Sequence, residues 1–181
     1  DEIFVDNTGF KFERLANRLR ELAFLNAGVA ITIINENTGV TLPYKFEGGI
    51  KSFVEFLNET HKVVHPEPFY MVESKDKIQV EISFQYNDTE HELLCTYANN
   101  INTTEGGTHL SGFKAALTRV INSYALSSKL IKENDPGFEG DDVREGIAAV
   151  ISIKIPNPQF EGQTKTKLSN SDVRGAVESL L

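Results

Sequence analysis

The fold is decided by AAVISIKIPNPQFEGQTKTKL at residues 148–168, where an apolar β-branched run passes into a proline-flanked polar loop. Residues 148–155 predict a strand, because Val and Ile side chains fit a buried pleated surface. Pro156 and Pro158 cannot donate to a ladder of backbone hydrogen bonds, and Gly162 permits a turn. The stretch therefore predicts a long loop leaving a strand, the kind of segment that carries functional side chains on a rigid scaffold.

Length and composition indicate a single globular domain. A chain of 181 residues with 40% hydrophobic residues buries roughly two thirds of its unfolded surface without disulfides. The lone Cys95 has no internal disulfide partner, which excludes a Cys-based zinc site and favours a reducing, cytoplasmic location. No apolar run approaches the roughly 20 residues of a membrane span, and no signal-peptide pattern opens the chain. We therefore expect a soluble protein. Because no initiator Met is present, we also expect the sequence to be a fragment of a longer protein.

Charge and histidine content narrow the possible partners. The net charge of −8 argues against a protein that coats nucleic acid through bulk electrostatics, so any such contact must come from a local patch. His61 and His65 have helical i, i+4 spacing, yet Pro66 follows and no acidic third ligand is patterned nearby. We therefore predict a solvated helix end here and no metal site.

The first half of the chain alternates helix and strand patterns. Apolar residues at spacings of three and four predict an amphipathic helix from Phe12 that ends near Gly28. Residues 29–34 and 40–46 predict a hairpin around a turn at residues 37–39, and residues 50–57 predict a second helix. The first helix has its apolar residues at Leu15, Ala16, Leu19, Leu22 and Ala23.

The second half contains the clearest strand patterns and the longest helix. Residues 69–73 predict an edge strand. Residues 78–86 alternate apolar and polar side chains, and we expect them to form a hairpin with residues 92–98. Gly106 and Gly107 then lead into the longest helix, with Thr108 as its cap. Its predicted inward stripe is Leu110, Phe113, Leu117, Val120, Ile121 and Tyr124, with Arg119 on the other side and Lys114 flanking it.

The last third predicts three further elements. Asp141 or Asp142 is expected to cap a short helix, a strand follows Gly146, and residues 170–181 predict a final helix. Neighbouring carboxylates in a polar loop are usually caps and solubilising charge, so we assign Asp141 and Asp142 a structural role.

Two motifs have the chemistry of anion binding. Gln163, Thr164 and Lys165 offer an amide, a hydroxyl and a flexible ammonium group that suit a terminal phosphate. The alternative is a solvated loop lysine. The glycines at Gly106 and Gly107 could seat an anion on a helix N-terminus, or could be only a tight turn into the helix. No P-loop, dinucleotide fingerprint or nucleophile elbow is present, so the chain contains no complete catalytic centre.

Several of these stretches together resemble the transducer domain of the DNA gyrase B family of type IIA topoisomerases. The resemblance rests on LRELAFLN at 19–26, YANNINTTEGGTH at 97–109, FKAALTR at 113–119, GDDVREG at 140–146 and PQFEGQTKTKL at 158–168. It covers almost the whole chain, so residues 1–181 are expected to be a transducer domain. The B subunit of topoisomerase IV shares many of these motifs and is the alternative.

The resemblance implies a fold and a role. The implied fold is α+β and related to domain 2 of ribosomal protein S5, a mixed β-sheet with helices on one face and a left-handed βαβ crossover. In the complete gyrase B protein this domain would follow a GHKL ATPase domain and precede a Toprim domain. Gln163, Thr164 and the catalytic Lys165 would reach the γ-phosphate of ATP bound with Mg²⁺ in the ATPase domain, and Arg119 would line the cavity that passes DNA.

The resemblance also implies partners and an activity that this chain lacks alone. The expected assembly is a homodimer through the ATPase region, joined by the gyrase A protein in an A2B2 heterotetramer that passes double-stranded DNA and introduces negative supercoils. The catalytic glutamate, the Mg²⁺-binding asparagine and the glycine-rich lid of the ATPase family do not occur here, so the fragment should be inactive. A free-standing S5-like RNA-binding module and a metabolic kinase are more remote alternatives, and the acidic balance disfavours the first.

Overall fold

The computed structural model describes residues 10–181, which form five helices and seven strands. These residues divide into two compact units, one ending at Phe53 and one running from Val54 to Leu181. The assignment of residues 1–181 to one domain stays a prediction.

The first unit consists of a helix and a two-stranded hairpin. Helix α1 (Phe12–Leu25) precedes strands β1 (Ile31–Ile34) and β2 (Thr41–Tyr44), which pair antiparallel. The ring of Phe24 stacks on that of Phe46 with 3.6 Å between centroids. The predicted helix and hairpin are confirmed, with strands shorter than the sequence indicated.

The second unit is built on a five-stranded mixed sheet. Its strands are β3 (Phe69–Lys75), β4 (Ile78–Tyr86), β5 (Leu93–Ala98), β6 (Ile101–Asn102) and β7 (Ile147–Lys154). Their spatial order is β3-β4-β7-β5-β6, with β5 parallel to β7 and every other neighbouring pair antiparallel. The edge position predicted for β3 is confirmed.

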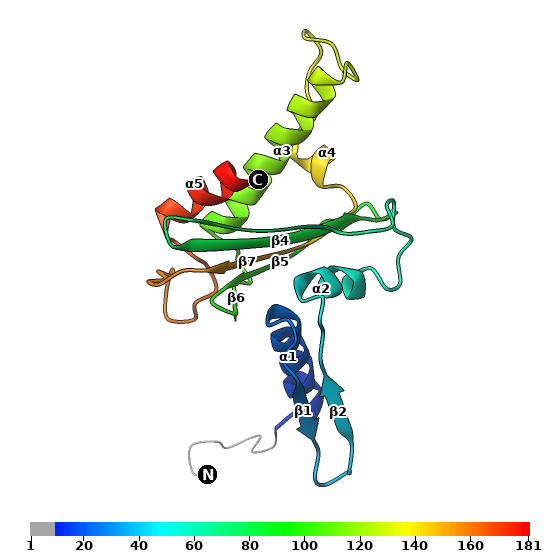
Figure 1. The fold of residues 1–181 in the computed structure, drawn as a ribbon, viewed down its shortest axis with the longest axis vertical. Coiled ribbons are helices and arrows are strands. Elements are labelled where there is room, and N and C mark those ends of the chain that lie inside the picture. Colours follow the sequence, from blue (N-terminus) through cyan, green and yellow to red (C-terminus); the bar gives the residue numbers. More distant parts are fainter. Residues whose placement is uncertain (1–9) are drawn as a thin grey trace. The chain divides into compact units, whose positions relative to one another are not determined.

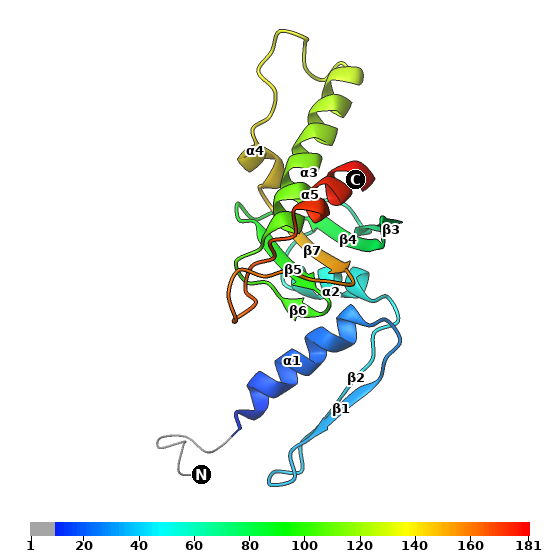
Figure 2. The same cartoon turned by 90° about the vertical axis from the view of Figure 1, so that its left-hand side faces the viewer.

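Helices cover one face of this sheet. Helix α3 (Thr108–Ser127) and helix α5 (Ser171–Leu180) pack against each other on the same side of the sheet in both views (Figures 1 and 2). The short helix α4 (Gly140–Arg144) lies beside α3, and the division between the units falls within α2 (Ile50–Leu57). The predicted α+β class is confirmed. The chain crosses from β5 through α3 and α4 to the parallel strand β7. The left-handedness expected for this crossover stays a prediction.

The hairpin expected between residues 78–86 and 92–98 is wrong, because β7 lies between β4 and β5. Strand β7 is buried at seven of its eight positions, so the centre of the sheet suits it better than either edge. The tight hairpins form at two other turns. Asp76 with Lys77 joins β3 to β4, and Asn99 with Asn100 joins β5 to β6, all four with positive φ as a type I′ turn requires.

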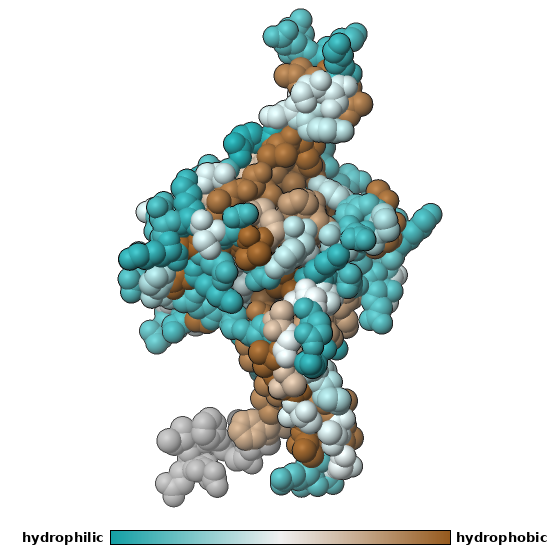
Figure 3. All heavy atoms as spheres, viewed as in Figure 1, coloured by the Kyte–Doolittle hydropathy of each residue, from teal (hydrophilic) through white to brown (hydrophobic). Residues whose placement is uncertain are grey.

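The main core lies between the sheet and helices α3 and α5. Phe113 and Leu117 face it as predicted, but Val120 is 41% exposed and Tyr124 65% exposed. The second half of α3 extends beyond the sheet (Figure 1), and apolar side chains are visible at the surface there (Figure 3). A periodic stripe predicts the side of a helix that is apolar, yet it does not say where the partner surface ends.

Two predicted helix caps are also corrected. Gly107 is the N-cap of α3, so Thr108 is its first helical residue and makes no capping bond. Glu139 is the N-cap of α4, where its side chain and that of Asp142 form a reciprocal capping box. The helices of residues 10–181 are too short or too polar for any of them to cross a membrane.

Candidate functional site: the loop after β7

The loop that follows β7 folds back on itself as a narrow arm. The backbone N–H of Glu161 donates to the carbonyl of Lys167 at 2.9 Å, and the N–H of Ser169 donates to the carbonyl of Gln159 at 2.9 Å. The carboxylate of Glu161 also pairs with the Lys167 ammonium group at 3.1 Å. These contacts close the two sides of the arm and leave residues 162–166 as its tip.

A buried asparagine holds the base of the arm. The side-chain oxygen of Asn170 accepts the N–H of Gln159 at 2.6 Å, and its amide nitrogen donates to the carbonyl of Asn157 at 3.1 Å. Asn170 is only 7% exposed and directly precedes α5. The two prolines therefore turn the chain away from the sheet, and Asn170 fixes where it returns.

The arm is also joined to the residues that begin α3. The N–H of Leu168 donates to the carbonyl of Gly106 at 3.0 Å, and the N–H of Thr108 donates to the carbonyl of Leu168 at 3.1 Å. One residue pair further out, the N–H of Glu105 donates to the carbonyl of Thr166 at 2.9 Å. The Thr166 hydroxyl donates to the Glu105 carboxylate at 3.0 Å. We call this contact between residues 105–108 and 166–168 the loop–α3 junction.

The junction and the turn before α3 engage three of the backbone donors near this helix N-terminus. The N–H groups of Glu105 and Thr108 bind the arm, and the N–H of Gly106 donates to Thr103 at 2.8 Å. Gly107 has a φ of 132°, a value that disfavours any side chain. The alternative of a tight turn into the helix is therefore the one that the geometry supports.

The tip carries the three residues singled out from the sequence. Gln163, Thr164 and Lys165 are all exposed, and the hydrogen bonds found among residues 10–181 include none from their side chains. Lys165 has a φ of 57°, in the left-handed region that residues other than Gly rarely adopt. The tip thus presents an amide, a hydroxyl and an ammonium group at the end of an arm that is held by hydrogen bonds and an ion pair.

Arg119 lies away from this tip. It is exposed on α3, and its guanidinium group donates to the carbonyl of Glu178 in α5 at 2.6 Å. A cation near the last turn of a helix complements the helix dipole. Eleven residues separate Arg119 from Thr108, about 16 Å along an α-helix. The structure therefore links Arg119 to the junction through α3 and does not bring it to Lys165.

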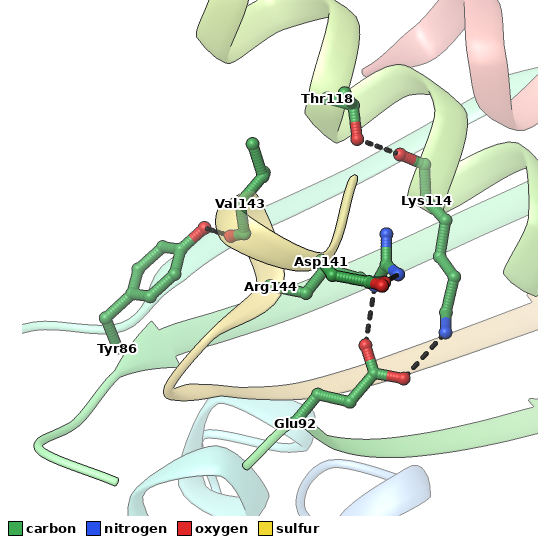
Figure 4. Close-up of polar contacts among 7 residues, drawn as sticks. All are labelled: Tyr86, Glu92, Lys114, Thr118, Asp141, Val143 and Arg144. Atoms are coloured by element: carbon green, nitrogen blue, oxygen red, sulfur yellow. Dashed lines mark hydrogen bonds and ion pairs between the residues drawn. The ribbon is translucent and has the colours of Figure 1, made fainter. Parts of the chain in front are cut away.

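A charge cluster that the sequence did not indicate binds α4 to α3 and to the start of β5 (Figure 4). Glu92 accepts from Lys114 at 2.7 Å and from Arg144 at 2.6 Å, and Arg144 also pairs with Asp141. Burial alone would raise the pKa of Glu92, but the hydrogen bonds from Lys114 and Arg144 hold that pKa below its ordinary value. These residues come from three distant stretches, so no local motif predicts them.

A buried polar network lies just before the junction. The Thr103 hydroxyl lies 3.0 Å from Nε2 of His109 and donates to the Thr96 carbonyl at 2.9 Å, while the Thr96 hydroxyl donates to the Thr103 carbonyl at 2.8 Å. His109 is fully buried, and burial lowers its pKa to about 4. It is therefore neutral at pH 7 and acts as a structural residue in the first turn of α3.

Of the two histidines singled out from the sequence, His61 and His65, the second makes structural contacts. Nδ1 of His65 lies 2.7 Å from the carbonyl of Glu67, and Nε2 accepts the backbone N–H of Tyr86 at 3.0 Å. Both ring nitrogens of His65 are thus engaged. Within residues 10–181, no three His, Cys, Asp or Glu side chains are grouped so as to hold a metal ion.

Comparisons with known proteins show which family this chain resembles. The family described as DNA gyrase B matches residues 49–181. The B subunit of DNA gyrase from Staphylococcus aureus (strain MRSA252) is 56% identical over 182 residues, which cover 99% of this chain and 28% of that relative. The chain therefore spans little more than a quarter of the relative's length.

Two solved structures have the same fold. The 43K ATPase domain of Thermus thermophilus gyrase B, in complex with an aminocoumarin, superposes with a TM-score of 0.85 at 37% identity, over 99% of this chain and 48% of that one. A topoisomerase IV ATP-binding domain from Francisella tularensis, in complex with a small-molecule inhibitor, gives a TM-score of 0.77 at 30% identity, over 99% and 49%.

Proposed function

This chain belongs to the DNA gyrase B family, and from that premise we propose that it couples ATP binding and hydrolysis in a longer protein to the passage of a DNA strand. We assign this transducer role to the second unit, Val54 to Leu181. Two boundaries support assigning the role to this unit and not to all of residues 1–181. The family match begins at residue 49, and the compact units divide after Phe53.

The observation that carries the proposal is the exposed tip of the arm. Gln163, Thr164 and Lys165 present donors with no partner among residues 10–181, while the arm beneath them is hydrogen-bonded on both sides. ATP and ADP differ by one phosphoryl group, so a sensor that distinguishes them must contact that group. A lysine ammonium group at the end of an anchored arm has the charge and the reach to do so.

We propose that Lys165 contacts the γ-phosphate bound by a neighbouring ATPase domain and that Gln163 assists it. Lys165 would also stabilise negative charge on the transferring phosphoryl group, as cationic side chains do in phosphoryl-transfer enzymes. The nucleotide supplies the phosphoryl group, and the described part of this chain offers no ligand set for its Mg²⁺. Those ligands would have to come from the ATPase domain.

The energetics require more than one contact. A hydrogen bond to a charged group contributes about 1.5–3 kcal/mol, whereas moving a two-state equilibrium from 1:99 to 99:1 takes about 5.5 kcal/mol. Lys165 therefore cannot drive the conformational change alone. Gln163, backbone contacts and dimerisation of the ATPase domains would have to supply the remainder.

The finer assignment is a gyrase that introduces negative supercoils in the cytoplasm as an A2B2 complex with the gyrase A protein. The 56% identity to the B subunit of a DNA gyrase supports it. The same domain of a topoisomerase IV, which would decatenate DNA, is the second candidate because of the 0.77 TM-score to such a protein. Supercoiling of relaxed DNA by the full-length protein with each candidate partner would distinguish the two.

The contact itself is tested by a structure of the full-length protein with a non-hydrolysable ATP analogue. We expect the Lys165 ammonium nitrogen within about 3 Å of a γ-phosphate oxygen. A closed, analogue-bound dimer in which the tip points into solvent would contradict the proposal.

A further inference from the structure

The arm has three connections to the rest of the second unit. It leaves the end of β7 through Pro156, it is bound to the start of α3 by the loop–α3 junction, and it continues through Asn170 into α5. The first is a covalent link through two prolines and an exposed Asn157. The second is four hydrogen bonds between residues 105–108 and 166–168, the segment directly next to Lys165.

We infer that Glu105, Gly107 and Thr166 are positioning residues that transmit a displacement of Lys165 to helix α3 through the loop–α3 junction. This inference rests on the proposed function, because it takes the contact of Lys165 with a phosphate as the source of the displacement. It adds the receiving element, which is α3 and not only the strand β7 from which the arm leaves.

The close approach of the two backbones makes the junction stiff. A Cβ atom on Gly107 would lie 2.6 Å from the backbone nitrogen of Leu168 and would overlap its carbonyl oxygen, so the chains have no room to slide past one another. Leu168 is 1% exposed and belongs to the main core, where Phe160 also packs. The inner end of the junction is therefore fixed by packing, and its outer end by Thr166 and Glu105.

A hydrogen-bond network also holds the turn that precedes α3. The N–H of Gly106 donates to the carbonyl of Thr103, whose hydroxyl lies 3.0 Å from Nε2 of His109. This network ties the turn before α3 to the first turn of the helix. A force applied at Thr166 would therefore reach α3 as a whole, without being absorbed by a flexible turn.

Helix α3 passes the displacement on to two further contacts. Lys114 binds Glu92 in the cluster of Figure 4, and Arg119 binds the carbonyl of Glu178 in α5. The two contacts lie little more than one turn apart on a helix of 20 residues. Movement of α3 along its axis would thus change α4 and α5 together.

The first test compares Thr166→Val with Thr166→Ser in the full-length protein together with its partner. Valine has nearly the shape of threonine but cannot donate to Glu105, whereas serine keeps the hydroxyl. We expect Thr166→Val to lower the number of strand passages per ATP hydrolysed about threefold, the effect of one lost hydrogen bond, with the KM for ATP within about twofold of the unmodified protein. Thr166→Ser should restore the coupling ratio, and an unchanged ratio in Thr166→Val would overturn the inference.

A disulfide across the junction gives a second, independent test. Glu105→Cys with Thr166→Cys removes the side-chain bond when reduced and replaces it with a covalent bond when oxidised. We expect the oxidised protein to couple more strand passages to each ATP than the same preparation after reduction. Loss of strand passage on oxidation would mean that the arm must separate from α3, and would overturn the inference.

Lys165→Ala separates this inference from the proposed function. If Lys165→Ala hydrolyses ATP normally, the phosphate contact itself is wrong. If Lys165→Ala loses hydrolysis while the Thr166 and disulfide variants keep a normal coupling ratio, only the route through α3 is wrong.

Discussion

The backbone nitrogen of Leu168 lies 2.6 Å from the position that a Cβ atom on Gly107 would take, and the carbonyl oxygen of Leu168 lies closer still. Real Cβ atoms do not approach other atoms so closely, and the obstacle is backbone on both sides. Gly107 also has a φ of 132°, which side chains disfavour. Two independent constraints thus require glycine where the arm meets α3.

Gly107→Ala should consequently destabilise the second unit. We expect a loss of about 2–4 kcal/mol in the free energy of unfolding, because the junction must open and the backbone is strained. Urea denaturation of the 181-residue chain measures it. Gly162→Ala is the matched control, since Gly162 also has positive φ but no atom within 4 Å of its Cβ position. A similar loss of unfolding free energy in both variants would contradict the claim that the close approach of Leu168 destabilises Gly107→Ala.

His109 should make the stability of the second unit depend on pH. Burial lowers its pKa from 6.5 to about 4, so the unfolded chain binds more protons than the folded chain between those values. The stability is then complete above pH 6.5 and falls by about 3 kcal/mol as the pH drops to 4.

Urea midpoints at pH 7.0 and pH 4.5 test this pH dependence. His109→Gln, which keeps an amide near Thr103 but does not titrate, should show a clearly smaller difference between the two midpoints. If His109→Gln retains the full difference, the pH dependence comes from other groups. Glu92 is not such a group, because its pKa is lowered from 4.5 and its contribution to stability is therefore lost mainly below that pH.

Arg144→Gln should loosen α4. The Arg144 side chain is 12% exposed and binds both Glu92 and Asp141, so its loss leaves Glu92 with Lys114 alone. We expect a cost of about 1–2 kcal/mol in the free energy of unfolding. Arg174→Gln is the control, because its i, i+4 pair with Glu178 is largely exposed and should contribute less than about 0.5 kcal/mol. Equal costs for the two variants would contradict the account of the cluster.

Arg119→Gln should separate hydrolysis from strand passage in the full-length protein. Arg119 lies about 16 Å along α3 from the junction and far from Lys165 in sequence, so basal ATP turnover should stay within about twofold. The rate of DNA supercoiling should fall, because the positive charge proposed for the DNA cavity is removed. Arg119→Lys, which keeps that charge, should retain most of the activity, and normal supercoiling by Arg119→Gln would reject the DNA contact.

The elements of this fold follow from local sequence more readily than their pairing does. Apolar spacing predicts α1 and α5, and a β-branched run predicts β7, because each pattern is complete within about ten residues. The pairing of β4 with β7 joins residues nearly seventy positions apart. Local sequence does not indicate that partner, so it predicts that residues 92–98 pair with residues 78–86.

The candidate site divides in the same way. Gln163, Thr164 and Lys165 are visible in sequence because their donors are consecutive and follow two prolines. The loop–α3 junction is made largely of backbone atoms, which leave no side-chain pattern. Its one sequence signal is the pair Gly106 and Gly107, which indicates a close approach but does not identify Leu168 as the neighbour.

The central claim is that Lys165 contacts the terminal phosphate, and steady-state ATP turnover by the full-length protein tests it most directly. Lys165→Ala should lower kcat at least about a hundredfold, the loss typical for one charge-stabilising donor in a transition state, while the circular dichroism spectrum and urea midpoint stay unchanged. Lys167→Ala, a neighbouring lysine paired with Glu161, should retain most of the turnover. Near-normal turnover in a folded Lys165→Ala protein would contradict the account.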